Sequence, residues 1–148
     1  MHLLPLAFLL ATQASASPQA RIENVGRDAA QCMAFYQAVE KYVARTEQER
    51  QGTKEMQGFM LVLGKESGIS VDAFEQIRSS QEHELESRVR ANDRVYLDGE
   101  QDRCGTFAKR QAEELRAKNR AGGEQFVQAD AASRRGLTQA FYRAGGRS

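Results

Sequence analysis

Histidine, the side chain that most often serves as a catalytic base or metal ligand, is almost missing from this sequence. Only His2 and His83 occur among 148 residues, and they form no His-Glu-x-x-His zinc motif. The sequence also contains no Gly-x-Ser-x-Gly nucleophile elbow, no P-loop and no Rossmann fingerprint. These absences exclude the enzyme classes that are recognised by those motifs.

Long apolar runs are missing beyond the start of the chain. After residue 16 the longest run, Phe59 to Leu63, is far shorter than the roughly 20 residues of a membrane-spanning helix. We therefore expect no membrane span.

The first 16 residues differ from the rest because they contain no Lys, Arg, Asp or Glu. An apolar stretch over residues 3–11, broken only by Pro5, is followed by the small residues Ala14-Ser15-Ala16. This pattern is typical of a secretory signal peptide cleaved near Ala16, although a buried helix start has the same composition. We expect a periplasmic or secreted protein, and no lipid anchor because no cysteine lies directly after the apolar stretch.

Cysteine is used only twice, at Cys32 and Cys104, and never as Cys-x-x-Cys. In an oxidising compartment the simplest arrangement is one disulfide between them. Such a bond would close a long loop, worth about 4 kcal/mol of stabilisation in the chain-entropy model. The alternatives are two free thiols or an intermolecular bond.

The formal net charge is +1, but the charges are unevenly distributed. Residues 61–102 contain 5 basic and 10 acidic side chains, whereas residues 103–148 contain 10 basic and 4 acidic ones. Acids are interspersed among the bases along helical stretches, which indicates solvated helix faces and no nucleic-acid binding. The acidic half of residues 70–90 and the basic C-terminal segment are candidate surfaces for orienting a partner.

Apolar residues recur at spacings of three and four in four stretches, which predicts helices over residues 28–46, 53–63, 70–90 and 98–122. Residues 58–64 could also form a buried strand, but no partner strand is visible. The inward stripe of the last stretch consists of Cys104, Phe107, Ala108, Gln111, Ala112 and Leu115.

Four segments follow from these patterns. Residues 1–16 are the predicted signal peptide, and residues 17–27 are a mostly looped N-terminal arm because they contain Pro18, Asn24 and Gly26. Residues 28–122 form a disulfide-linked helical domain. Residues 123–148 are a basic C-terminal segment, either with a fifth helix over 130–144 or partly disordered. The fold class is an all-α, single-domain bundle of four to five helices with one interhelical disulfide.

Two groups of residues invite a metal-site interpretation. His83 lies beside Glu82 and Glu86, but an exposed histidine on a charged helix explains this pattern better. Residues 93–102 are rich in acids, yet a calcium loop with Gly99 at its sixth position would begin at Arg94, which cannot supply an oxygen ligand. We therefore predict no metal and no cofactor.

Methionine and phenylalanine could together line an adaptable apolar groove for a ligand. Their helical spacing favours core packing instead. The residues concerned are Met33, Phe35, Met56, Phe59, Met60 and Phe74.

Reactive groups are scarce, whereas charge and apolar surface are plentiful. We therefore expect a non-catalytic periplasmic binding or interaction protein, such as a chaperone, an inhibitor or an envelope accessory factor, with another protein as its partner. The alternative is a small hydrolase that depends on a carboxylate pair or on a metal at His83. The sequence favours no particular carboxylate pair.

Overall fold

The computed structural model describes residues 17–119, and within this range the chain forms four α-helices and no strand. These helices are α1 (Pro18–Tyr42), α2 (Glu47–Glu66), α3 (Val71–Arg90) and α4 (Arg94–Lys118). The all-α prediction is confirmed, as is helix rather than strand for residues 58–64. Across the described helices, no segment is long and apolar enough to cross a membrane. The predicted signal peptide and the segment 123–148 lie outside the described residues.

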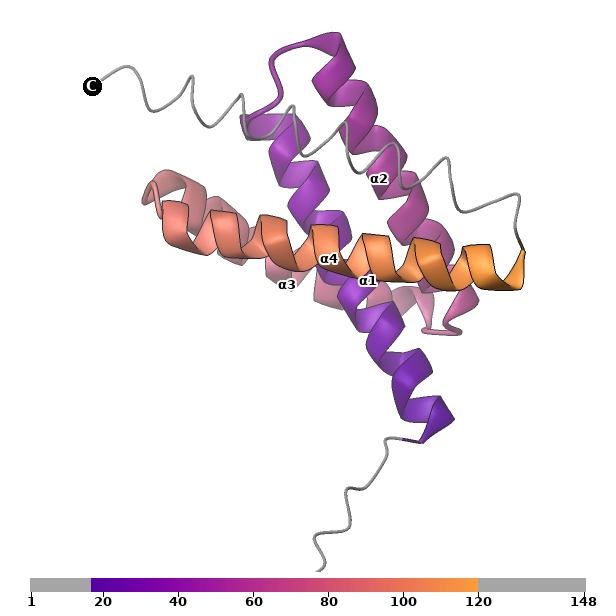
Figure 1. Ribbon diagram of the computed structural model, residues 1–148. Coiled ribbons are helices and arrows are strands. Elements are labelled where there is room, and N and C mark those ends of the chain that lie inside the picture. The colour runs from indigo at the N-terminus through magenta and orange to yellow at the C-terminus, as the bar shows by residue number, and fades with distance from the viewer. Residues whose placement is uncertain (1–16, 120–148) are drawn as a thin grey trace, which may run out of the picture.

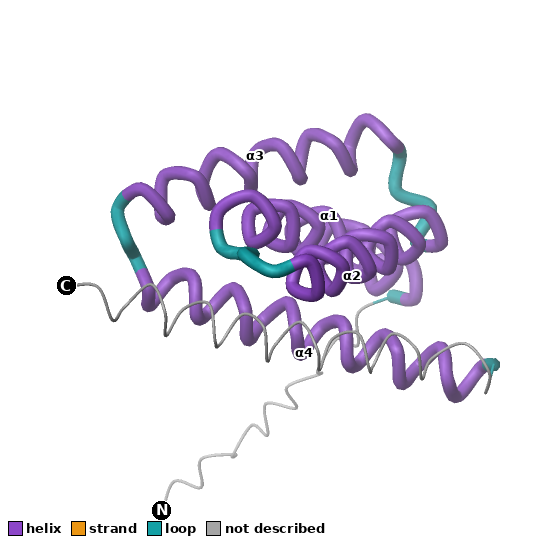
Figure 2. The backbone as a smooth tube through the Cα atoms, turned by 90° about the horizontal axis from the view of Figure 1, so that it is seen from above, coloured by secondary structure: helices purple, strands orange, loops and turns teal. Residues whose placement is uncertain are grey.

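The bundle has a layered arrangement. Figure 1 shows α1 and α2 as one helical hairpin, crossed in front by α4 and behind by α3. Seen from above in Figure 2, the α1–α2 hairpin lies between α3 and α4. Helix α1 contacts all three other helices, most extensively α2 and α3 and less extensively α4. It is therefore the central element of the fold.

The sequence of α1 suits this central position. Its buried residues point in every direction around the helix axis, as expected for a helix surrounded by neighbours. Many of them are alanines, which let those neighbours approach closely, while three larger side chains fill the remaining space. The buried residues are Ala29, Ala30, Cys32, Ala34, Phe35, Tyr36, Ala38 and Val39.

The prediction of a mostly looped N-terminal arm over residues 17–27 is wrong, because α1 already begins at Pro18. Proline is tolerated at the first helical position, where its missing N–H would have no helical partner. Gly26 is equally compatible with the helix, and its small size has a packing role. A Cβ atom there would overlap Ser67 and Ile69, so glycine allows the α2–α3 turn to lie directly on α1.

Two further helix starts lie earlier than predicted. Thr46 and Glu49 form a reciprocal capping box, so α2 begins at Glu47, ahead of the predicted start at residue 53, and runs through Gly52. Asp93 caps α4 by accepting a hydrogen bond of 3.1 Å from the Tyr96 N–H. Ser70 caps α3 as its sequence predicts, accepting from the Ala73 N–H at 3.1 Å.

The predicted disulfide is present. Cys32 and Cys104 are bonded, their Cα atoms lie 5.4 Å apart, and both side chains are fully buried. The bond joins the central helix α1 to α4 across 72 positions of sequence.

Two glycines of α2 provide a matched test of the packing. A Cβ at Gly64 would overlap the ring of Phe74, whereas a Cβ at Gly58 would meet nothing within 4 Å. We expect Gly64→Ala to lower the free energy of unfolding by about 1–3 kcal/mol through overpacking. Gly58→Ala should raise it by about 0.5–1 kcal/mol because alanine favours the helix.

Urea denaturation of both variants beside the wild-type protein measures these changes. Equal destabilisation by the two substitutions would contradict the close packing of α2 on Phe74.

Candidate functional site

The acidic half of α3, a candidate surface from the sequence, is engaged in ion pairs within the bundle. Glu82 contacts Arg78 at 2.9 Å, and Glu84 contacts Arg88 at 2.7 Å. Glu86 reaches across to the end of α1. These acids are therefore paired with basic side chains of the same bundle and do not form a free acidic patch. The basic C-terminal segment, the other candidate surface, lies outside the described residues.

Lys41, Tyr42 and Glu86 form a polar group that joins α1 and α3. The Tyr42 hydroxyl donates to Glu86 Oε1 at 2.7 Å, and Lys41 Nζ donates to the same oxygen at 3.0 Å. These contacts, first that of Tyr42 and then that of Lys41, hold the pKa of Glu86 below its ordinary value. The group fastens α3 to the C-terminal end of α1, which is a structural role.

The metal-site interpretations find no support within the part of the chain that the structure describes. His83 is exposed, and residues 17–119 contain no group of three His, Cys, Asp or Glu side chains placed to hold a metal ion. In the acid-rich turn, Asp93 caps α4 and contacts Arg88 at 2.8 Å. Glu100 contacts Arg103 at 2.8 Å.

The methionines and phenylalanines do not line a groove. Phe35, Met56, Phe59 and Met60 are almost completely buried in the core, and Phe74 packs against the core from α3. Met33 is partly buried against the same cluster. Core packing, which their spacing favours, is therefore their role.

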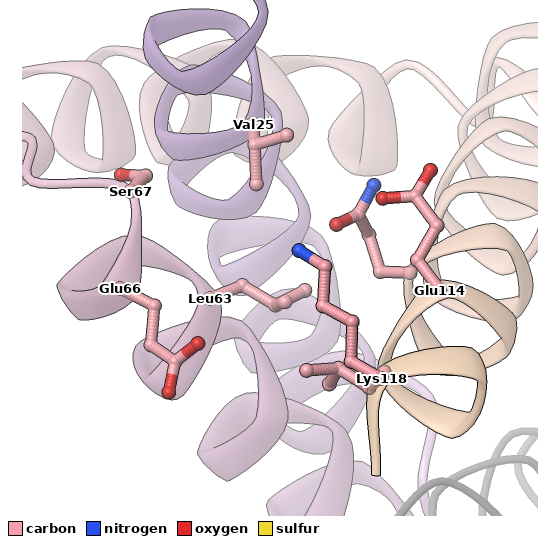
Figure 3. Close-up of a pocket in the computed structure, with 8 residues that line it drawn as sticks. Val25, Leu63, Glu66, Ser67, Glu114 and Lys118 are labelled. Atoms are coloured by element: carbon pink, nitrogen blue, oxygen red, sulfur yellow. The ribbon is translucent and has the colours of Figure 1, made fainter.

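A cavity lies where the N-terminal half of α1, the C-terminal end of α2 and the C-terminal half of α4 meet (Figure 3). Its volume is about 200 Å³. The side chains around it are of three kinds: aliphatic, neutral polar and charged. They are Val25, Leu63, Leu115, Ser67, Gln111, Glu66, Glu114 and Lys118.

Gln111 is the most informative residue of this cavity. Its side chain is only 7% exposed, yet its amide makes no hydrogen bond with any residue from 17 to 119. The other polar residue that is buried in the described part of the chain, Thr53, instead donates to the Arg50 carbonyl at 2.7 Å. The amide is not fully enclosed: among residues 17–119 the buried side-chain nitrogen or oxygen that lacks a partner belongs to Arg116, not to Gln111. The sequence contained a signal for this residue, because Gln111 is a polar side chain in the apolar stripe of α4.

The charged side chains around the cavity also differ from those elsewhere in the bundle. Arg78, Arg88 and Arg103 each contact two carboxylates. Within the described range, by contrast, Glu66, Glu114 and Lys118 form no ion pair within 4 Å. In Figure 3 the Lys118 side chain extends toward Val25, with Glu114 on one side and Ser67 on the other. The cavity therefore offers charges of both signs beside an aliphatic surface.

The Glu86 contacts predict a dependence of stability on pH. Folding lowers the pKa of Glu86. Ionised Glu86 therefore contributes to the free energy of unfolding above its unfolded-state pKa, and this contribution is lost as pH falls through the folded-state pKa. Glu86→Gln should therefore destabilise the protein at neutral pH, and the difference from wild type should vanish in acid. Urea denaturation from neutral to acidic pH measures this.

Two variants sharpen this experiment. Tyr42→Phe removes the stronger hydrogen bond, so NMR titration should show the pKa of Glu86 moving back up toward its ordinary value. Glu113→Gln, an exposed residue of α4, should leave the pH profile unchanged. If Tyr42→Phe leaves the pKa of Glu86 unchanged, the Tyr42 hydroxyl is not the cause of its lowered pKa.

Comparison of the chain with protein-family models, curated proteins and solved structures gave no significant match.

Proposed function

We propose that the protein is a non-catalytic binding protein that acts after export and holds its ligand in the cavity between α1, α2 and α4. The observation that carries this proposal is Gln111, a side chain only 7% exposed that lines the cavity and forms no hydrogen bond with residues 17–119. A ligand in the cavity could therefore form hydrogen bonds with this amide without displacing a protein partner.

The size of the cavity limits what can bind. At about 200 Å³ it is smaller than the roughly 300–1,000 Å³ pockets that take drug-sized ligands. It can take one small molecule, or a single side chain of a partner protein. A chaperone, inhibitor or envelope accessory factor would therefore recognise its partner here through one anchoring residue.

The hydrolase alternative draws less support from the site. The carboxylates of the cavity are Glu66 and Glu114, both exposed and on different helices. His83 lies on α3 and is not among the lining residues. The cavity thus has groups that can hold a ligand, and no histidine beside them to activate a nucleophile.

Export is supported by the buried disulfide, because such bonds persist in oxidising compartments. When the full chain is expressed in a host with a periplasm, we expect mature protein that begins at Ser17. Its non-reducing peptide map should contain Cys32 joined to Cys104. Ala16→Glu should block cleavage, because the processing site requires a small residue. Protein that keeps Met1 and has free thiols would contradict export.

Binding is tested with a variant that fills the cavity. Leu115→Phe enlarges a partly buried lining residue, whereas Val95→Phe enlarges an 86% exposed residue of the same helix outside the cavity. Mature wild-type protein, labelled with ¹⁵N, should show amide shifts around the cavity when mixed with fractionated cell-envelope extract. We expect Leu115→Phe to weaken this binding at least about tenfold, a change of about 1.4 kcal/mol, and Val95→Phe to preserve it.

Thermal unfolding of both variants first checks that they fold. Equal binding by Leu115→Phe and wild type, or no response to any fraction, would contradict the proposal. Conversion of the bound molecule into a product would favour the hydrolase.

A further inference from the structure

We infer that the cavity binds a free aliphatic α-amino acid, of the size of valine or leucine, as its zwitterion. This inference rests on the proposed function and names the class of ligand. It follows from three properties of the site: its volume, the combination of aliphatic and oppositely charged side chains, and the unbonded amide.

The volume matches one amino acid. Cavities of roughly 150 Å³ accept molecules of the size of benzene, and this cavity is slightly larger at about 200 Å³. Nucleotides and oligosaccharides are too large for it. A branched aliphatic side chain could contact Val25, Leu63 and Leu115, which come from three different helices.

The charges select a zwitterion. Lys118 can donate to a carboxylate, whereas Glu114 and Glu66 can accept from an ammonium group. A simple fatty acid would place its carboxylate among two glutamates, and a simple amine would place its charge beside Lys118. Like charges brought together in this way oppose binding. A ligand with both charges avoids each conflict.

The amide of Gln111 serves the same ligand. It has two N–H donors and one carbonyl acceptor, so it can donate to the carboxylate or accept from the ammonium group. Because the three cavity charges form no ion pair within the described residues, a ligand does not have to break existing pairs. Elsewhere in the bundle, at Arg78 or Arg88 for example, it would have to displace two carboxylates.

The inference is tested by NMR titration of the mature, disulfide-bonded protein with L-leucine. Three analogues each remove one feature: 4-methylpentanoic acid lacks the ammonium group, 3-methylbutylamine lacks the carboxylate, and glycine lacks the aliphatic side chain. We expect leucine to shift amides around the cavity, and each analogue to bind at least about tenfold more weakly.

Matched substitutions on α4 locate the binding groups. Lys118→Gln and Glu114→Gln should each weaken leucine binding several-fold. Lys109→Gln and Glu113→Gln remove the same charges at exposed positions outside the cavity and should leave binding unchanged. Equal affinities of leucine and its analogues, or equal effects of the cavity and control substitutions, would overturn the inference.

A leucine-containing peptide with both ends blocked separates the remaining outcomes. If it binds more tightly than free leucine, the occupant is a side chain of a partner protein, and the amino-acid inference is wrong while the binding function stands. The same conclusion follows if leucine does not bind but the extract still shifts the cavity amides of the wild-type protein and not those of Leu115→Phe. If leucine, peptide and extract all fail, the inference and the proposed function are both wrong.

Discussion

The disulfide between Cys32 and Cys104 joins the central helix to the helix that packs against it less extensively than α2 and α3 do. By the chain-entropy model, closing a loop of this length is worth about 4 kcal/mol, a large share of the 5–15 kcal/mol that typically stabilises a small domain. Helix α4 supplies half of the cavity lining, including Gln111 and Lys118. The position of the cavity therefore depends on a covalent bond as well as on packing.

Close packing around α1 explains why the cavity lies where it does. Alanines along the middle of α1 bring its neighbours close, and Gly26 lets the α2–α3 turn lie on the same helix. At the end of α4 the lining changes to longer aliphatic and charged side chains that leave space between them (Figure 3). The same bundle thus combines a dense core, where Met56 and Phe59 are completely buried, with an open site at one end.

The distribution of ion pairs separates structure from function in this protein. The cited acids of α3 form ion pairs within α3 and with α1, so these charges are already engaged inside the bundle. The charges around the cavity have no such partners within residues 17–119. Function is therefore better sought in a small mixed site than in the charged surfaces that dominate the composition.

The sequence by itself determined the all-helical fold, the inward stripes and the disulfide, because periodicity reports which face of a helix is apolar and two cysteines leave one intramolecular pairing. It predicted wrong helix starts at α1, α2 and α4, since local rules treat Pro18 and Gly52 as breakers and do not weigh packing. Only the tertiary structure decided that α1 is covered on every side and that Gln111 lines one cavity with Val25 and Leu63. The physical reason is that a sequence pattern shows which face of a helix must be covered, whereas the helices that cover it are chosen by packing across distant segments.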